Sequence, residues 1–384
     1  MKEIILLGAT GSIGTQALEI IKHNNEYKVK AISVGHNIKK AKEIIQEFNI
    51  ECVNVIEESD ALKLQKEFPN VLVSFGEEGL IKMIKKYPGD LLNAITGIAG
   101  LLPTIEGIKQ KKNILLANKE TMVVAGDIIN QMANDNDVKI IPIDSEHNAI
   151  YRLLNNENKK TVKNLIITAS GGAFRDKTRS ELENVSVRDA LCHPNWQMGM
   201  KITVDCATMV NKGLEVMEAH HLFGFSYDQI KTVIHKESII HSMVEFNDNS
   251  VSALMYNPSM TLPISYALFK EPVDSLVKEL DFEEVSTLSF KKMDYERYPM
   301  IELAYRVGKM GGFIPTIYNA SNEIAVSLFL NEKINFLEIE DIIYEAINNK
   351  DYYLKKLDNL DFNIDNILLL DEIVKVDIKN RFRR

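Results

Sequence analysis

The first 143 residues alternate short apolar runs with stretches of helical periodicity, and this rhythm constrains the fold more strongly than any other feature of the chain. Apolar runs such as EIILLG, VKAISVG and NVLVSF are separated by segments long enough for one helix each. Strands separated by helices require right-handed crossovers and so form a parallel, doubly wound sheet of the α/β class. Because ligands of such sheets bind at the carboxyl ends of the strands, the residues that follow each predicted strand are candidates for a binding site.

Past residue 160 the pattern changes to a mixture of strands and helices. The run ATMVNKGLEVMEAHHLF predicts one helix, and KTVIHKESIIHSMVEFNDNSVSALMY predicts strands joined at an Asn-Asp-Asn turn. From Tyr298 the pattern predicts helices interrupted at Gly311, Gly312 and Pro315. We predict four segments: 1–144, an α/β domain; 145–270, a central α+β domain; 271–295, a connector; and 296–384, a C-terminal helical domain.

Composition excludes several classes of protein. The chain of 384 residues has no apolar run near the roughly 18 residues of a membrane span, and its net charge of −9 argues against nucleic acid or an anionic membrane as a partner. Its three cysteines lack CxxC spacing, which argues against a disulfide framework and a structural zinc site. Because the first predicted strand leaves no room for a signal peptide, we expect a cytoplasmic protein.

A glycine-rich turn follows the first predicted strand. In LLGATGSIGTQALEII, Gly8, Gly11 and Gly14 lie between that strand and a helix. Glycine permits a tight turn and a close approach of the backbone to a pyrophosphate, which the helix N-terminus also attracts. We interpret the turn as the dinucleotide site of a Rossmann-like domain; the alternative is a purely structural turn.

The second predicted strand ends in SVGHNIKK and lacks the acidic residue that usually binds the ribose 2′-hydroxyl of NAD. A carboxylate would repel a 2′-phosphate, whereas Gly35, His36 and Asn37, followed by two lysines, would not. The sequence therefore predicts NADPH rather than NADH. The alternative is that His36 and the lysines only begin a polar helix.

Polar residues also follow two later strands of this sheet. ILLANKE ends in Lys119 and Glu120, and IPIDSEHNAI places Asp144 and Glu146 two residues apart. Side chains two residues apart in an extended segment point the same way, so both carboxylates can bind one cation, and their oxygens suit Mg²⁺ or Mn²⁺. Each stretch could instead be a helix cap.

A catalytic triad within DSEHN is excluded on the same grounds. Neighbours in an extended chain alternate between faces, so Ser145 and His147 do not converge with Asp144 as a triad requires. Two carboxylates alone make a weak metal site, so a third acidic ligand is expected. Glu215 in ATMVNKGLE is the candidate, and it follows an asparagine and a lysine.

Two loops of the second half complete the set of candidates. Ser170 in TASGGAF offers a hydroxyl and neighbouring N–H groups to a phosphate; the alternative is a turn that merely ends a strand. LCHPNWQMGMK holds the only tryptophan, Trp196, which fits either a core position or a flap that covers a ligand.

Taken together, these motifs closely resemble the 1-deoxy-D-xylulose 5-phosphate reductoisomerase family. The matching stretches GATGSIG, LLANKE, DSEHNAI, SGG, HPNW, ATMVNKGLE, IHSMV and NASNE keep the family's order over nearly the whole length. The resemblance implies conversion of a sugar phosphate, 1-deoxy-D-xylulose 5-phosphate, into 2-C-methyl-D-erythritol 4-phosphate for isoprenoid synthesis, by retroaldol cleavage, aldol rejoining and hydride transfer. It also implies NADPH, Mg²⁺ or Mn²⁺ with Co²⁺ as a further candidate, and a homodimer. On this resemblance, segment 1–144 would be the NADPH-binding domain and 145–270 the catalytic domain that binds metal and substrate.

The resemblance assigns a role to each residue that matches a family motif. The NADPH contacts would be Thr10, Gly11, Ser12, Ile13, Gly35, His36, Asn37, Asn118, Glu120 and Gly199. The metal ligands would be Asp144, Glu146 and Glu215. The substrate contacts would be Lys119, Ser145, Glu146, Ser170, His193, Cys206, Asn211, Lys212 and Glu215, with Ser170, Asn211 and Lys212 near the phosphate. The catalytic candidates are Lys119 and Glu146 for proton transfer and His193, which with Trp196 would close a lid.

Three positions depart from the family's pattern. Cys206 stands where the family usually has a phosphate-binding serine, and a thiol is a weaker hydrogen-bond donor than a hydroxyl. Cys192 and His36 each replace a residue that is often basic. The thiol at position 206 therefore puts one phosphate contact in question.

Two other functions compete with this interpretation. A semialdehyde-type Rossmann dehydrogenase would use Cys192 or Cys206 as a nucleophile and work without a metal ion. An NADPH-sensing regulator would bind ligands without turnover. NADPH absorbance, followed with 1-deoxy-D-xylulose 5-phosphate in the presence and absence of Mn²⁺, distinguishes all three.

Overall fold

The computed structural model describes residues 1–196, 198–274 and 276–382 and divides into two compact units. The first unit comprises Met1–Thr121, Ile128–Asn148 and Ser259–Lys278. The second comprises Met122–Asp127, Ala149–Pro258 and Glu279–Arg384. Each unit contains one sheet.

The first unit is built on a seven-stranded sheet in which all neighbours are parallel, in the order β4-β3-β2-β1-β5-β6-β7. Its strands are β1 (Lys2–Leu7), β2 (Tyr27–Ser33), β3 (Cys52–Val55), β4 (Leu72–Phe75), β5 (Asp90–Asn93), β6 (Ile114–Leu116) and β7 (Ile140–Pro142). The predicted parallel, doubly wound sheet is confirmed. The strand order reverses beside β1, where ligands of such sheets bind.

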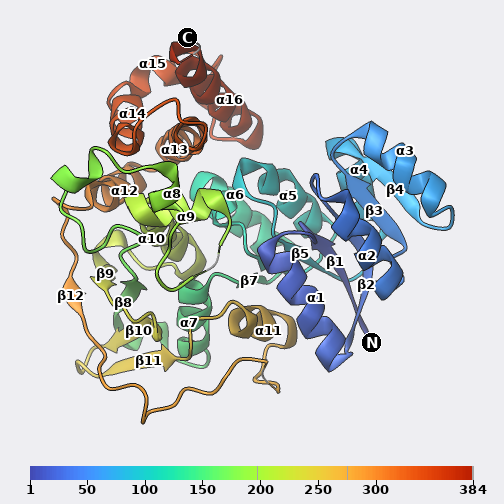
Figure 1. Cartoon of the computed structure of the whole chain (residues 1–384), viewed down its shortest axis with the longest axis horizontal. Helices are drawn as coiled ribbons and strands as arrows, with labels where there is room; N and C mark the ends of the chain where they lie inside the picture. The colour runs from blue at the N-terminus through green and yellow to red at the C-terminus, as the bar shows by residue number, and fades with distance from the viewer. Residues whose placement is uncertain (197, 275, 383–384) are drawn as a thin grey trace. The chain divides into compact units, whose positions relative to one another are not determined.

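Helices connect these strands, as Figure 1 shows in blue to green. They are α1 (Ser12–Asn24), α2 (Ile38–Phe48), α3 (Glu58–Glu67), α4 (Gly76–Lys86), α5 (Leu101–Lys109) and α6 (Lys119–Asp135), followed after β7 by α7 (Ser145–Leu153). The central strands are continuous apolar runs because both faces are covered: Ile4, Ile5, Leu6 and Leu7 of β1 are all fully buried.

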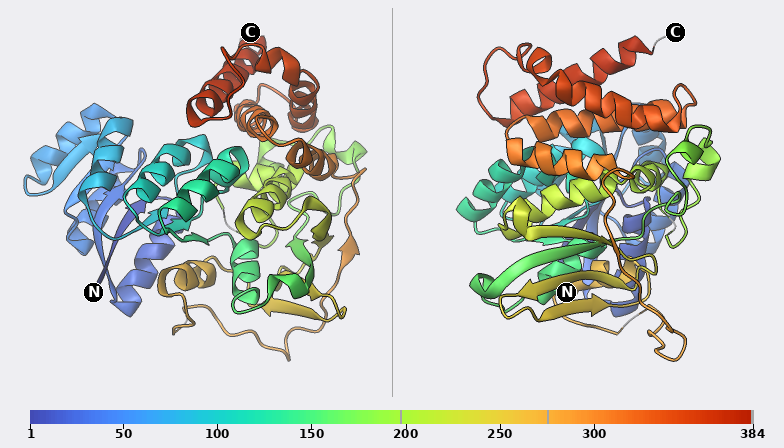
Figure 2. Two further views of the ribbon diagram at one scale, coloured as in Figure 1. Left: turned by 180° about the vertical axis from the view of Figure 1, so that it is seen from behind. Right: turned by 90° about the vertical axis from the view of Figure 1, so that its left-hand side faces the viewer.

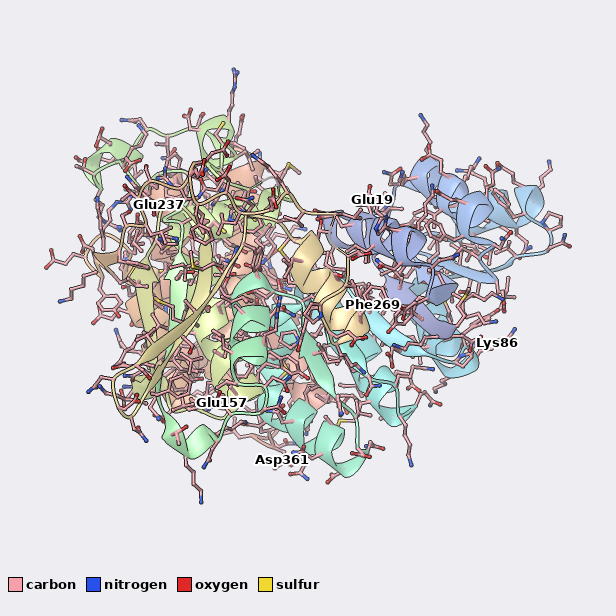
Figure 3. The ribbon with its side chains drawn as sticks, turned by 90° about the horizontal axis from the view of Figure 1, so that it is seen from below. Glu19, Lys86, Glu157, Glu237, Phe269 and Asp361 are labelled. Atoms are coloured by element: carbon pink, nitrogen blue, oxygen red, sulfur yellow. The ribbon has the colours of Figure 1, made fainter. Side chains whose placement is uncertain are left out.

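A helix from much later in the chain completes the first unit. The apolar helix α11 (Thr261–Phe269) packs on α1, and Figure 3 shows it, labelled at Phe269, beside the helix that carries Glu19. The hydroxyl of Tyr27 donates a hydrogen bond of 2.6 Å to the carbonyl of Leu268, and the Tyr27 and Phe269 rings meet edge to face. Residues 259–278 thus fold with the first unit, although the sequence pattern grouped 145–270 as a central segment.

The second unit contains a mixed five-stranded sheet in the order β11-β10-β8-β9-β12. Its strands are β8 (Val162–Ala169), β9 (Ile230–Ile234), β10 (Ile240–Phe246), β11 (Val251–Met255) and β12 (Lys291–Lys292). The Asn-Asp-Asn turn predicted between two strands joins β10 to β11, with Asn249 at a φ of 67° and the N–H of Phe246 bonded to the carbonyl of Ser250.

The helix predicted from ATMVNKGLEVMEAHHLF is present as α10 (Val210–Phe223), and a break precedes it. α9 (Met200–Thr208) ends at Met209, which has a left-handed conformation with a φ of 63°, and α10 begins at once. The prediction of one helix is confirmed over Val210–Phe223, but its start was placed at Ala207 because no glycine or proline marks the break. A buried methionine holds a conformation that local sequence preferences disfavour.

The C-terminal part of the second unit is helical, as predicted, and Figure 2 shows it in orange and red. Its helices are α12 (Pro299–Met310), α13 (Ile314–Leu330), α14 (Phe336–Asn348), α15 (Lys350–Leu354) and α16 (Ile364–Arg381); a short α8 (Val187–Ala190) precedes α9. The break between α12 and α13 falls at Gly311 and Gly312, both with positive φ. Among the described residues, every helix is too short or too polar to span a lipid bilayer.

Candidate functional site

A tight turn follows β1 at the point where the strand order of the first sheet reverses. Gly8 has a φ of +78°, and a Cβ there would lie 2.7 Å from the carbonyl oxygen of Ala94. A Cβ on Gly14 would lie 2.4 Å from the oxygen of Gly8, so α1 can pack this closely on the turn only with glycine at that position. α1 begins after Gly11 without a side-chain cap, which leaves backbone N–H groups of its first turn for a ligand.

Of the ten residues predicted to contact NADPH, nine lie in the first unit and follow β1, β2 or β6 at the carboxyl edge of the sheet. Gly11, Ser12, His36 and Asn37 are exposed there. Asn37 also caps α2, since its side-chain oxygen accepts a hydrogen bond of 3.1 Å from the N–H of Lys40. The tenth, Gly199, lies in the second unit, where it precedes α9.

The side chain of Asn118 makes its hydrogen bonds to other groups of the protein. Its side-chain oxygen accepts from the N–H of Thr121 and caps α6, while its amide nitrogen donates to the carbonyls of Ile95 and Gly97, at 2.7 Å each, and to Glu120. The capping interpretation of this stretch therefore holds for the Asn118 side chain. A cofactor contact at this position would have to come from its backbone.

Lys119 and Asp144 meet at the carboxyl ends of neighbouring strands, β6 and β7. The ammonium of Lys119 donates to Asp144 Oδ2 at 2.7 Å, and their side chains are only 7% and 11% exposed. The pair is therefore a charge-assisted hydrogen bond at this edge of the sheet.

The structure corrects the geometry predicted for DSEHN. The segment is helical rather than extended, because α7 begins at Ser145. Asp144 behaves as its cap: Oδ1 accepts from the N–H of Glu146 at 3.2 Å, and its carbonyl accepts from the N–H of Asn148. Carboxylate oxygens of Asp144 and Glu146 nevertheless lie within 4.8 Å of each other, so the two side chains could hold one cation from the start of a helix.

His147 is a residue whose importance the sequence pattern did not reveal. Its Nδ1 lies 3.0 Å from Asp144 Oδ1, and its side chain is fully buried. The argument that alternating faces keep His147 away from Asp144 was therefore wrong, since the two are i and i+3 at the start of a helix. A triad is still absent, because the Ser145 hydroxyl donates to Glu146.

In the second unit, the first turns of α10 carry a cluster of three buried polar side chains. Asn211 Nδ2 donates to Glu215 Oε1 at 2.6 Å, and the Lys212 ammonium pairs with the other oxygen of the same carboxylate. Asn211 and Lys212 lie at the helix N-terminus, where the backbone dipole favours an anion.

Ser170 follows β8, and its loop packs directly on α9. Gly171 and Gly172 have φ values of +88° and +70°, and a Cβ on Gly172 would lie 2.4 Å from the carbonyl oxygen of Cys206. The Ser170 hydroxyl lies 3.0 Å from His193 Nε2 and accepts from the N–H of Gly172. The structure thus brings together Ser170, His193 and the end of α9 within one unit.

The tautomer of His193 follows from its hydrogen bonds. Nδ1 accepts from the backbone N–H groups of Asn195 and Trp196, at 3.2 and 3.0 Å, so the proton of the neutral ring is on Nε2 and points to Ser170. Burial, reinforced by the positive charge of Arg175, lowers the pKa of His193 to about 4. Near neutral pH the ring is therefore an uncharged hydrogen-bond donor toward Ser170.

Trp196 is half-buried and packs edge to face against His241, with ring centroids 6.0 Å apart. The neighbouring Asn195 donates from its amide to the carbonyl of Lys236 and the hydroxyl of Ser238, at 2.7 Å each, in the turn between β9 and β10. Of the two cysteines discussed above, Cys206 is partly buried and Cys192 is exposed. Trp196 is thus not a fully buried core residue.

Comparison with known proteins places these features in one family. The family model for 1-deoxy-D-xylulose 5-phosphate reductoisomerase matches residues 4–126, that for its C-terminal domain matches 140–223, and a DXP reductoisomerase C-terminal domain model matches 255–382. The 1-deoxy-D-xylulose 5-phosphate reductoisomerase 2 of Bacillus anthracis is 48% identical over 386 residues, covering 99% of this chain and 98% of its own. This chain belongs to the 1-deoxy-D-xylulose 5-phosphate reductoisomerase family. The reductoisomerase of Listeria monocytogenes serotype 4b is likewise 48% identical, over 99% of both chains.

Solved reductoisomerase structures have the same fold. A DOX-P reductoisomerase in complex with NADPH, fosmidomycin and magnesium matches with a TM-score of 0.94 at 35% identity, covering 100% of this chain and 98% of that one. The reductoisomerase of Zymomonas mobilis in complex with NADPH matches with a TM-score of 0.90 at 33% identity, covering 100% and 99%.

The reductoisomerase residues described above fit the groups present in those complexes. The turn around Gly8 and Gly14 is too close-packed for side chains and opens onto an uncapped helix N-terminus, as a pyrophosphate requires. Asp144 and Glu146 offer only carboxylate oxygens, which are the ligands that Mg²⁺ prefers.

Proposed function

We propose that this protein reduces and rearranges 1-deoxy-D-xylulose 5-phosphate to 2-C-methyl-D-erythritol 4-phosphate with NADPH and a divalent cation. Family membership over the whole chain carries the proposal, and two half-sites support it. Lys119, Asp144 and Glu146 cluster at the carboxyl edge of the first sheet, and Lys212 and Glu215 cluster on α10.

In the proposed site, Glu215 joins Asp144 and Glu146 as the third ligand of the cation. When bound, the cation supplies Lewis-acid polarisation of the carbonyl and hydroxyl oxygens of the substrate. His147 holds Asp144 in place through its 3.0 Å hydrogen bond, in the way that outer partners orient metal ligands. Mg²⁺ fits this oxygen donor set, and we propose that Mn²⁺ or Co²⁺ can replace it.

The substrate phosphate is assigned to the second unit. Ser170, Asn211 and Lys212 would bind its oxygens, with the N-terminus of α10 adding a favourable dipole. His193 donates its Nε2 proton toward Ser170 and so fixes the direction of that hydroxyl. Cys206 would be the weak member of this set, because a thiol is a poorer donor than a hydroxyl.

The nicotinamide cofactor is assigned to the first unit. The turn at Thr10, Gly11, Ser12 and Ile13 would bind its pyrophosphate, and residues 35–37 would accept the 2′-phosphate. Bound NADPH supplies the hydride that reduces the aldehyde formed by rearrangement.

Proton transfer is assigned to groups beside the reacting oxygens. Lys119 donates to Asp144 and would protonate the aldehyde oxygen when the hydride adds to the aldehyde carbon, and Glu146 would accept a proton from a substrate hydroxyl. Ser145 donates to Glu146 and keeps that carboxylate oriented. The Trp196 loop would cover the substrate and exclude water.

We further propose a homodimer that works in the cytoplasm. Cys52, Cys192 and Cys206 are all free thiols, as a reducing compartment favours.

The test is NADPH oxidation with 1-deoxy-D-xylulose 5-phosphate, with and without Mg²⁺ or Mn²⁺. We expect turnover only with the cation, and Glu215→Gln should lose most of it while retaining NADPH affinity. Turnover that survives EDTA would instead support a cysteine-dependent dehydrogenase, and ligand binding without turnover would support a regulator.

A further inference from the structure

The family motif NASNE, residues 319–323, lies on α13 and has no role in the site described so far. α13 packs on α9, which carries Cys206, and Figure 1 shows the two helices in neighbouring positions. Both belong to the second unit. Asn322 is fully buried on this helix, so its polar side chain requires a partner.

That partner is Asp205, which is 2% exposed and immediately precedes Cys206. Asn322 Nδ2 donates to Asp205 Oδ1 at 2.9 Å. On its other side the carboxylate accepts a hydrogen bond of 2.8 Å from the Lys201 ammonium, one turn earlier on α9. Because the carboxylate can only accept, the Asn322 amide must face it with its nitrogen, and the orientation of both side chains is fixed.

Asp205 lies on α9, and a small displacement of this helix would move every candidate phosphate contact. The Ser170 loop packs on α9 so closely that Gly172 has no room for a Cβ beside Cys206. α9 then passes through left-handed Met209 directly into α10, whose first residues include Asn211 and Lys212. The two helices and the loop therefore have little freedom to move independently.

We propose that Asp205 and Asn322 are positioning residues that fix α9, and through it the phosphate-binding groups, from the C-terminal helices. The proposal rests on the phosphate site assigned under the proposed function. It gives the NASNE motif a task at the site, although Asn322 contributes no direct contact to the substrate.

The decisive variant is Asn322→Leu, which keeps the size of the side chain and removes the donor. A buried carboxylate then loses a charge-assisted hydrogen bond, and α9 can move to seek another donor. We expect the inhibition constant of inorganic phosphate and the KM for the sugar phosphate each to rise about tenfold, because hydrogen bonds to charged groups are strong. NADPH affinity should be unchanged.

Asn319→Leu is the matched control. Asn319 is equally buried on the same helix, but its amide donates to Glu323 on that helix, at 3.1 Å, and not to α9. It should lower thermal stability as much as Asn322→Leu does, while leaving phosphate inhibition unchanged. Equal phosphate inhibition in the two variants would overturn the proposal.

An exchange of the two side chains keeps the test decisive if Asn322→Leu does not fold. Asn322→Asp alone would set two carboxylates against each other, whereas Asp205→Asn combined with Asn322→Asp restores a donor facing an acceptor. Recovery of phosphate affinity in the double variant supports the proposal, and no recovery overturns it. Lys212→Met tests the phosphate site separately from the positioning role of Asp205 and Asn322. If this variant leaves phosphate inhibition intact, the proposed phosphate site itself is wrong.

Discussion

Replacing Gly14 with alanine tests whether the turn after β1 is built to let a backbone approach a nucleotide. The added methyl group would lie 2.4 Å from the oxygen of Gly8 and 2.6 Å from Ala9 Cα, whereas ordinary contacts begin near 3.4 Å. Both neighbours are backbone atoms and cannot rotate away. The N-terminal end of α1 must therefore move away from Gly8 and Ala9 by about 1 Å. A displacement of this size is costly in a pre-formed site.

The size of the effect follows from the cost of overpacking. Inserting a methyl group into a filled space costs about 1–3 kcal/mol, and the absence of flexible neighbours favours the upper half of that range. If α1 relieves the strain by moving, the cost falls on NADPH binding, and the Kd should rise about 30- to 150-fold.

Calorimetric titration with NADPH measures the Kd, and circular dichroism verifies that the variant is folded. Gly107→Ala is the control, because its methyl group would meet the side-chain ends of Leu91 and Ile114, at 2.6 and 2.8 Å, away from the turn. That variant should lose stability yet keep its NADPH Kd within about twofold. A folded Gly14→Ala protein with an equally unchanged Kd would refute the reasoning.

Four further predictions concern the rest of the site. Lys119→Met should reduce turnover about 10²- to 10⁴-fold with NADPH affinity retained, measured by single-turnover kinetics; a smaller loss would exclude proton transfer by Lys119. Cys206→Ser should lower the KM for the sugar phosphate about 2- to 10-fold in steady-state assays, because a hydroxyl replaces a thiol, and an unchanged KM would place the thiol outside the site. Folding lowers the pKa of His193 from 6.5 to about 4, so the folded state resists protonation. The contribution of this residue to the free energy of unfolding is therefore complete above pH 6.5 and is lost as the pH falls toward 4. Urea unfolding should show a larger fall in the free energy of unfolding between pH 7 and pH 5 for this protein than for His193→Asn. EDTA should abolish turnover but spare NADPH binding, and added Mg²⁺ should restore it, unless the catalytic groups act without a metal ion.

Periodicity was sufficient to predict the first sheet because its central strands, such as β1, are apolar runs buried on both faces, and helices make the crossovers. It failed where a local preference was overridden by packing. Met209 adopts a left-handed conformation that only its buried surroundings enforce, and α11 joins α1 through contacts that no local pattern encodes.

The sequence nominated the candidate site residues one by one but did not predict their geometry. Asp144 and Glu146 were selected on the assumption of an extended segment, yet they begin a helix, and that same helix brings His147 onto Asp144. A hydrogen bond between residues i and i+3 becomes visible only once the helix start is known. The partnership of Asp205 with Asn322, 117 residues later, leaves no periodic trace in the sequence.

The return of α11 to the first unit has a consequence for the order in which the chain folds during synthesis. Ala17, Leu18, Ile20 and Ile21 are buried on α1, and α11 is among the elements that cover this helix. The ribosome releases residues 261–269 only after most of the second unit's sheet has been made, so the seven strands of the first sheet are complete long before their helical cover is. Until then the face of α1 that packs on α11 is exposed in the nascent chain, and a chaperone that binds apolar surface would protect it during that interval.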